Sequence, residues 1–210
     1  MKILFTHGYF LSEDPKELQI MRPYVPLGIL YISSFIEKHG YENDVFDSTF
    51  STLDKLKEQL IITTPDIVAI YTNLMTKLNV LKIMKYIKNE PALKNTKIIL
   101  GGPEVRNHIE NFLNYGADFI IIGEGEETTL ELLKTIESIN ASTPLSMTIS
   151  NIKGLAYLEN EKVVTTPERA LIKDVNTLPF PNREKIDFAP YLNGWKMHHG
   201  YSMMSVNTMR

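Results

Sequence analysis

The chain has 210 residues, of which 43% are hydrophobic and 22% are charged, a composition typical of a globular protein with a sizeable core. Its net charge of −3 provides no basic surface for a polyanion, so we do not expect nucleic acid as a partner. The absence of cysteine excludes disulfides, a cysteine nucleophile and a thiolate-held iron–sulfur cluster within these residues.

Short apolar runs alternate with helical patterns along the first two thirds of the chain. Five runs predict strands, at residues 2–6, 43–47, 66–72, 97–100 and 118–122. Apolar residues at helical spacing follow each of them, from Leu27 to Phe35, Leu53 to Leu60, Leu74 to Met84, Val105 to Leu113 and Leu132 to Ile139. The third run, DIVAIYT, is apolar at both alternating sets of positions, which is typical of a central strand.

Five strands that are each followed by a helix predict an α/β fold, with a five-stranded parallel, doubly wound sheet of the Rossmann-like or flavodoxin-like kind. Open sheets of this kind bind ligands beyond the carboxyl ends of their strands. Residues 7–25, 48–51, 72–76, 101–104 and 123–127 follow those ends, so we expect the functional residues there.

The pattern changes after about residue 141. Residues 155–166 predict a β-hairpin with its turn near Glu159-Asn160-Glu161, and residues 174–192, with three prolines, predict an extended linker. Residues 200–210 begin to alternate like a strand, whereas Trp195 and His198-His199 are expected to be exposed. We therefore predict a domain at 1–140, and a hairpin and linker at 141–210.

Residues 1–17 begin with one lysine and a short apolar stretch that His7 and Gly8 interrupt, which is not the pattern of a signal peptide. No apolar run approaches the roughly 20 residues of a membrane span. We expect a cytoplasmic protein that does not insert into a membrane.

The turn Gly123-Glu124-Gly125 at first resembles a phosphate-binding loop. A dinucleotide fingerprint follows the first strand and has a third glycine, whereas this turn follows the fifth and Thr128 stands in the third place. Its glutamates would also repel a pyrophosphate. The loop HGYFLSEDP is not the Ser/Thr-rich phosphate loop of an FMN site, and the hydrolase motif G-x-S-x-G is absent.

Four longer stretches carry a family resemblance. They are PLGILYISSFIEKHGYENDVFD (26–47), IILGGPEV (98–105), ADFIIIGEGEETTLELL (117–133), and the hairpin and L-P-x-P-x-R linker in 152–192. Together they resemble the N-terminal cobalamin-binding region of B12-dependent radical SAM enzymes of the anaerobic magnesium-protoporphyrin cyclase group. The motif G-E-G-E-x-T after the fifth strand is the most specific element.

The resemblance implies that the nucleotide tail of cobalamin lies beside the fourth and fifth strands. Glycines in these turns would let the backbone approach the tail, and glutamates would accept hydrogen bonds from ribose or corrin amides. The element Thr72-x-Leu74 resembles a Ser-x-Leu element of cobalamin domains. The residues expected at the cofactor are His7, Gly8, Tyr9, Thr72, Asn73, Leu74, Thr76, Gly101, Gly102, Pro103, Gly123, Glu124, Gly125 and Glu126.

The loop after the first strand departs from many cobalamin domains. Their D-x-H-x-x-G motif supplies a histidine ligand to cobalt, whereas FTHGYF has only the histidine. The cyclase-like group commonly lacks this motif, so the resemblance implies base-off cobalamin without a protein histidine ligand. His7 as an axial ligand is the alternative, although a lone histidine more often bonds to the backbone. Arg22 and Tyr24 lie on the same loop and are candidates to face the corrin.

In the resembling enzymes a cysteine motif that holds a 4Fe–4S cluster follows a strand like SVNTMR. We therefore expect a radical SAM barrel, with the cluster and S-adenosylmethionine, in a missing part of a longer parent. This chain would bind cobalamin and catalyse nothing alone, whereas the parent would be a methyltransferase or a cyclase-type enzyme. Two alternatives stay open: a flavodoxin-like domain that binds a nucleotide or flavin, and a ligand-free interaction module.

Overall fold

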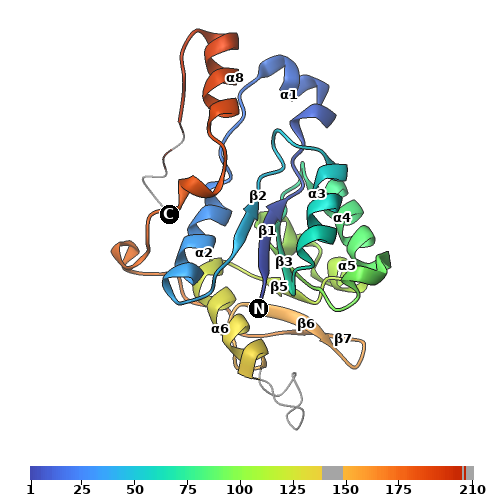
Figure 1. Ribbon diagram of the computed structural model, residues 1–210. Helices are drawn as coiled ribbons and strands as arrows, with labels where there is room; N and C mark the ends of the chain where they lie inside the picture. Colours follow the sequence, from blue (N-terminus) through green and yellow to red (C-terminus); the bar gives the residue numbers. More distant parts are fainter. Residues whose placement is uncertain (139–148, 205, 207–210) are drawn as a thin grey trace.

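A seven-stranded sheet forms the centre of the computed structural model, which describes residues 1–138, 149–204 and 206 (Figure 1). The strand order is β2-β1-β3-β4-β5-β6-β7. The parallel strands are β1 (Ile3–His7), β2 (Asp44–Phe46), β3 (Ile67–Tyr71), β4 (Lys97–Gly101) and β5 (Phe119–Ile121), and the antiparallel ones are β6 (Leu155–Glu159) and β7 (Lys162–Thr165). The predicted parallel α/β sheet is confirmed, and its order β2-β1-β3-β4-β5 is the flavodoxin-like one.

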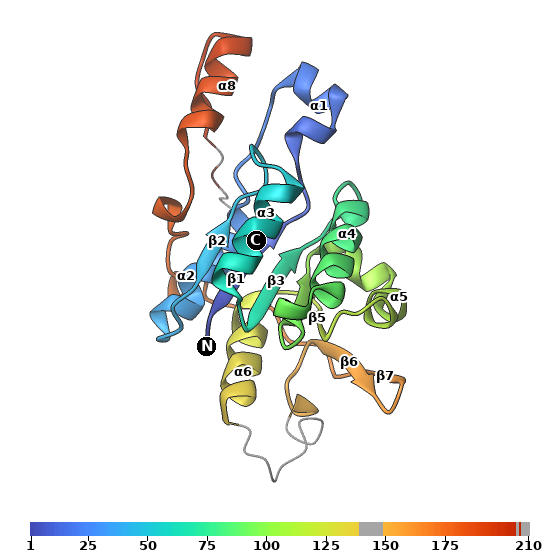
Figure 2. The ribbon, with the colours of Figure 1, turned by 45° about the vertical axis from the view of Figure 1, so that its right-hand side comes forward.

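Helices cover both faces of the sheet (Figures 1 and 2). The described α-helices are α1 (Pro15–Ile20), α2 (Leu27–Lys38), α3 (Leu53–Thr63), α4 (Lys77–Asn89), α5 (Ile109–Asn114), α6 (Gly125–Ser138) and α8 (Ala189–His199). The 3-10 helices are η1 (Leu11–Glu13), η2 (Pro91–Leu93), η3 (Pro103–Asn107), η4 (Val175–Thr177) and η5 (Arg183–Lys185). Helices α3, α4 and α5 pack on one face, and α2 and α6 pack on the other. No helix in the described ranges is long and apolar enough to cross a membrane.

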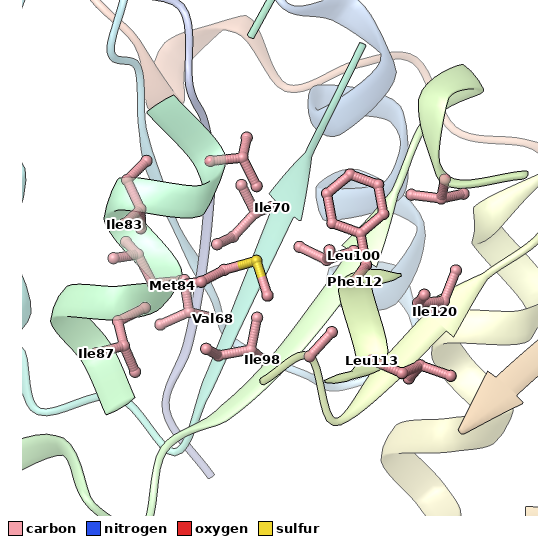
Figure 3. Packing of buried hydrophobic residues seen from close by; sticks show 14 of the residues in the cluster. Val68, Ile70, Ile83, Met84, Ile87, Ile98, Leu100, Phe112, Leu113 and Ile120 are labelled. Atoms are coloured by element: carbon pink, nitrogen blue, oxygen red, sulfur yellow. The ribbon is translucent and has the colours of Figure 1, made fainter. Parts of the chain in front are cut away.

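The face under α4 and α5 is filled by large apolar side chains (Figure 3). Alternate residues of the strands point to this face, because side chains along a strand alternate between its two sides. They meet a stripe on α4 and the inner side of α5. The residues labelled in Figure 3 are Val68, Ile70, Ile83, Met84, Ile87, Ile98, Leu100, Phe112, Leu113 and Ile120.

The face under α2 and α6 is filled at one end only. The strand residues Ile67, Ile99 and Phe119 are buried against the helices. Two residues farther along β3 and β4, the same face carries Ala69 and Gly101. Because these residues are small, the carboxyl half of this face keeps space between the sheet and the helices.

The predicted apolar face of the helix after β3 was wrong in its first half, whereas Leu81 and Met84 do pack toward the core as predicted. The pattern from Leu74 to Met84 placed Leu74 and Leu78 inside, but the two side chains are 72% and 71% exposed. Helix α4 starts at Lys77, after a turn in which the side chains of Asn73 and Thr76 bond to each other's backbone N–H. Its buried stripe is Val80, Ile83, Met84 and Ile87, which has the i, i+3, i+4, i+7 spacing of a helix face.

The predicted hairpin is confirmed, and it extends the sheet instead of standing apart from it. Strand β6 pairs antiparallel with β5, and β7 pairs with β6. Asn160 and Glu161 adopt positive φ values of 49° and 64° at the hairpin turn. The hairpin thus forms the edge of the same sheet that carries the predicted site.

Two of the α-helices in the described residues, α1 and α8, were missed in the sequence. Asp14 caps α1 by accepting hydrogen bonds from the backbone N–H groups of Lys16 and Glu17. Helix α8 replaces the last part of the predicted linker, where Pro190 is tolerated in the first turn and Gly200 adopts the left-handed cap conformation. Trp195 is buried on α8, not exposed as predicted.

Two further predictions concern the ends of helices and strands. The helix predicted from Val105 to Leu113 is divided into η3 and α5, with His108 between them. A strand was predicted to begin within residues 200–210, but residues 200–204 contain none, and of the remaining residues only 206 is described. Ile139, the last residue of the predicted fifth helix, also lies outside the described residues.

Candidate functional site

Two cavities adjoin at the carboxyl ends of the parallel strands. The edge cavity has a volume of about 440 Å³ and is lined by His7, Tyr9, Tyr24, Val25, Pro26, Leu27, Gly28, Ile29, Thr49, Tyr71, Asn73 and Thr76. The inter-helix cavity, of about 390 Å³, is lined by Phe5, Gly28, Ile29, Ile32, Ala69, Ile70, Tyr71, Ile99, Gly101, Gly102, Ile121, Gly123, Glu124, Gly125, Glu126, Thr129 and Leu171. Gly28, Ile29 and Tyr71 belong to both, so the cavities share a boundary.

The inter-helix cavity lies between the sheet and helices α2 and α6. Small residues create it on the sheet side, where a Cβ added at Gly101 would meet no atom within 4 Å. Gly28 on α2 leaves similar space, since a Cβ there would also meet nothing within 4 Å. The lining is apolar except near Glu124, Glu126 and Thr129. Such a cavity is suited to a mainly apolar group with one polar edge.

Some turn glycines are required by the backbone itself. Gly102 has a φ of +106°, and a Cβ there would lie 2.3 Å from the carbonyl oxygen of Thr72. A Cβ at Gly8 would lie 2.9 Å from the carbonyl oxygen of Thr76. These two glycines let neighbouring turns of the carboxyl edge pack closely. Gly123 also has a left-handed φ, of +93°.

His7 is buried at the edge cavity and both of its ring nitrogens are engaged. Its Nε2 lies 3.0 Å from a carboxylate oxygen of Asp47, and its Nδ1 accepts a hydrogen bond from the backbone N–H of Tyr9 at 3.2 Å. The backbone N–H of Ser48 also donates to Nε2, at 3.3 Å, so each ring nitrogen of His7 faces a backbone donor. His7 is therefore a structural histidine that joins β1 to the residue after β2.

Asp47 connects the sheet to helix α8. The hydroxyl of Tyr191 donates to Asp47 at 2.6 Å and lies 2.8 Å from the hydroxyl of Thr49. Burial raises the pKa of Asp47, but hydrogen bonds from His7, Tyr191 and the backbone of Thr49 outweigh burial and leave this pKa below its ordinary value. Burial and the Asp47 charge raise the pKa of Tyr191. The carboxylate thus holds three elements of the edge together.

Tyrosines form the wall of the edge cavity. Tyr9 and Tyr24 stack with ring centroids 6.1 Å apart and an angle of 17° between their planes. Burial raises the pKa of Tyr9 and the pKa of Tyr71, so both phenols are neutral at pH 7. The described residues that line the two cavities include no lysine or arginine. The site therefore has aromatic faces and neutral donors, but no cation for a phosphate dianion.

An ion pair holds two of the turns. The ammonium of Lys77, in the first turn of α4, lies 2.7 Å from a carboxylate oxygen of Glu104 on η3. This hydrogen bond lowers the pKa of Glu104. Because Lys77 follows the β3 turn and Glu104 follows the β4 turn, the pair fixes these turns relative to each other.

The structure separates the residues predicted for the site into three groups. His7, Tyr9, Asn73 and Thr76 line the edge cavity. Gly101, Gly102, Gly123, Glu124, Gly125 and Glu126 line the inter-helix cavity. Gly8, Thr72, Leu74 and Pro103 line neither, although each lies in a turn that carries lining residues.

Several lining residues were missed in the sequence. Alternation along the strands was the available signal for Ala69, because it shares a sheet face with Gly101. The stretch Pro26-Leu27-Gly28 belonged to the resemblance but was not assigned to a site. No local pattern distinguishes Leu171 or Thr49. Glu124, predicted to face a ligand, accepts a hydrogen bond from the backbone N–H of Ile172 at 2.6 Å.

Comparison with known proteins identifies related chains. A family model described as the B12 binding domain matches residues 20–133, more than half of the chain. An uncharacterized methyltransferase of Pyrococcus horikoshii is 29% identical over 175 residues, which are 79% of this chain and 35% of that protein. An anaerobic magnesium-protoporphyrin IX monomethyl ester cyclase of Cereibacter sphaeroides is 29% identical over 187 residues, 85% of this chain and 28% of the cyclase. The chain thus spans 28–35% of the length of these relatives.

Two solved structures share the fold. OxsB, a cobalamin-dependent S-adenosylmethionine radical enzyme solved with aqua-cobalamin, aligns with a TM-score of 0.64 at 16% identity, over 81% of this chain and 22% of OxsB. TsrM of Kitasatospora setae, a radical S-adenosylmethionine methyltransferase solved with cobalamin and a 4Fe–4S cluster, aligns with a TM-score of 0.60 at 16% identity, over 92% of this chain and 33% of TsrM.

Proposed function

The chain belongs to the B12-binding domain family, and we propose that its adjoining cavities hold cobalamin, with the corrin at the edge cavity and the nucleotide tail in the inter-helix cavity. The observation that carries this assignment is that the two cavities adjoin, since Gly28, Ile29 and Tyr71 line both. A ligand at the strand ends reaches the space between sheet and helices because Ala69 and Gly101 carry no large side chains. A planar aromatic base fits the apolar lining of that space.

A buried hydroxyl supports this assignment. Among the described residues, the side-chain oxygen of Thr72 has no hydrogen-bond partner although the residue is fully buried. An unsatisfied buried hydroxyl costs about 1–3 kcal/mol, so a ligand acceptor would stabilise the bound state. Thr72 lies between Tyr71, which lines both cavities, and Asn73, which lines the edge cavity. Because Thr72 lines neither cavity, its hydroxyl would donate to a polar atom of the nucleotide tail only after this turn moves on binding.

Cobalt would be held base-off and without a protein histidine. The ring nitrogens of His7 already bond to Asp47 and to the Tyr9 backbone, so ligation would require breaking a buried network. The neutral phenols of Tyr9 and Tyr71 would instead contact the corrin face or its amides. When bound, cobalamin supplies a cobalt centre for methyl transfer or radical chemistry. The residues of this chain bind and orient it.

The rest of the chemistry belongs to a longer protein. A radical SAM barrel that follows this region would hold the 4Fe–4S cluster and S-adenosylmethionine, since this chain has no cysteine. The whole protein would be a methyltransferase or a cyclase-type enzyme, and the region described would not catalyse alone. The predicted division at residues 140 and 141 and a cytoplasmic location stay predictions.

The two alternatives fit the site less well. The terminal phosphate dianion of FMN or of a nucleotide would meet the carboxylates of Glu124 and Glu126, with no lysine or arginine among the described residues that line the cavities, whereas the phosphodiester in the tail of cobalamin carries a single charge. A ligand-free interaction module would have strand-end side chains that close the crevice. Glycine and alanine keep the crevice open.

Retention of a corrin tests the proposal. We would mix the 210-residue chain with hydroxocobalamin, methylcobalamin or FMN, pass each mixture through a desalting column and record the visible spectrum of the protein fraction. We expect co-eluting corrin with a base-off spectrum and no flavin. Retained FMN without corrin would establish the flavin alternative, and retention of neither would favour the interaction module.

Replacing Thr72 with valine is expected to change binding and stability in opposite directions. The variant removes one donor to the ligand, so cobalamin affinity should fall about tenfold, equivalent to about 1.4 kcal/mol. The free protein should be equally or more stable, because an unsatisfied buried hydroxyl is replaced by a methyl group. Spectroscopic titration and thermal unfolding measure the two effects. Unchanged cobalamin affinity would remove Thr72 from the site.

A further inference from the structure

The segment after β7 crosses the helix pair that walls the inter-helix cavity (Figure 1). We call residues 167–185 the strap. One end is bonded to the first turns of α6, and the other end is bonded to α2, where Asn182 donates its backbone N–H to Ser34 and Lys185 pairs with Glu37. The strap therefore connects the two helices between which the cavity lies.

Arg169 fixes the first part of the strap. Its guanidinium bonds to the hydroxyl of Thr128 at 2.8 Å, to Glu127 at 3.0 Å and, through two nitrogens, to Glu131. A planar guanidinium with several fixed acceptors has little freedom of orientation. Three residues later, the backbone N–H of Ile172 donates to Glu124 at 2.6 Å. The strap is thus held on both sides of residues 170 and 171.

Leu171 lies between these two attachments and lines the inter-helix cavity while it is 73% exposed. An apolar side chain that is fixed at the rim of an apolar cavity gains burial only when something fills the cavity. Of the residues that line the inter-helix cavity, Leu171 alone comes from the strap.

We propose that Leu171 is a specificity-determining residue, which covers the aromatic base of bound cobalamin and makes the site discriminate against corrinoids that lack the nucleotide tail. Arg169 is a positioning residue that acts through Leu171. The inference rests on the proposed cobalamin function, because it assigns a role within the same site. It predicts that the strap contributes to tail binding and contributes nothing to corrin binding.

The test compares cobalamin with cobinamide, which has the corrin but no nucleotide tail. The 210-residue chain and its Leu171→Ser variant are titrated with both compounds, and visible spectra report binding. We expect Leu171→Ser to weaken cobalamin binding about tenfold and to leave cobinamide binding unchanged. Ile62→Ser is the matched control, since Ile62 is 78% exposed on α3 and lines neither cavity, and it should change neither affinity.

A second variant tests the positioning role. Arg169→Gln should lower the ratio of cobalamin to cobinamide affinity about as much as Leu171→Ser does, and it should add little in the double variant, because both act through one contact. Equal losses for cobalamin and cobinamide, or no loss for either, would overturn the inference while leaving cobalamin binding by the unsubstituted chain as evidence for the proposed function. Failure of the unsubstituted chain to bind cobalamin would overturn both.

Discussion

Replacing Gly101 with phenylalanine is expected to abolish the retention of cobalamin while leaving the fold intact. A Cβ at this position meets no atom within 4 Å, and its side chain would enter the inter-helix cavity. The phenyl ring would take the space proposed for the aromatic base. Burial of an aromatic group is worth about 3 kcal/mol, so the affinity should fall about 100-fold. Spectroscopic titration with hydroxocobalamin measures this loss.

A graded series separates exclusion of the ligand from damage to the protein. Gly101→Ala should bind more weakly than the unsubstituted chain but more tightly than Gly101→Phe, because a methyl group fills less of the cavity. Thermal unfolding should be nearly unchanged, since Gly101 does not have a left-handed φ. Leu78→Phe is the control, at a position that is exposed and lines neither cavity. Full cobalamin affinity in Gly101→Phe would place the tail elsewhere.

The second large effect is expected at Asp47. Its replacement with alanine would leave the buried groups of His7 and Tyr191 without their shared acceptor. Hydrogen bonds to a charged group contribute about 1.5–3 kcal/mol each, so the free energy of unfolding should fall by about 3 kcal/mol or more. Urea unfolding at pH 7 measures the change. Asp44→Ala provides the control, because Asp44 is an exposed acid on the neighbouring strand, β2.

The same carboxylate predicts a pH dependence. The pKa of Asp47 is lower in the folded protein than its ordinary value of about 3.9. A depressed pKa contributes stability above the unfolded value, and this contribution is lost as the pH falls through the folded value. The stability difference between the unsubstituted chain and Asp47→Ala should therefore shrink below about pH 4. A difference that stays constant from pH 7 to pH 3 would contradict the assigned charge.

Much of the sheet and its turns could be predicted from local patterns. Alternation of strand and helix signals predicted the parallel sheet, and turns with glycine marked the carboxyl edge, because backbone conformation depends on nearby residues. Local patterns predicted less well which side of a helix is buried, because that depends on how the helix packs against the sheet. Leu74, in the turn before α4, and Leu78, on α4, matched the apolar spacing as well as Val80 and Ile83 did, but only the second pair faces the sheet.

The sequence by itself predicted the kind of fold and the sheet edge of the proposed site, and its family resemblance implied the proposed cofactor. Only the tertiary structure decided the partners of that edge: Tyr191 is bonded to Asp47 across 144 residues, and Leu171 meets a cavity formed by strands and helices from the first two thirds of the chain. The physical reason is that a helix or strand pattern records whether each position is buried. A cavity, however, depends on small side chains in several segments that only the folded chain brings together. The hydrogen-bond donors of a buried carboxylate likewise depend on which distant residues the fold places beside it.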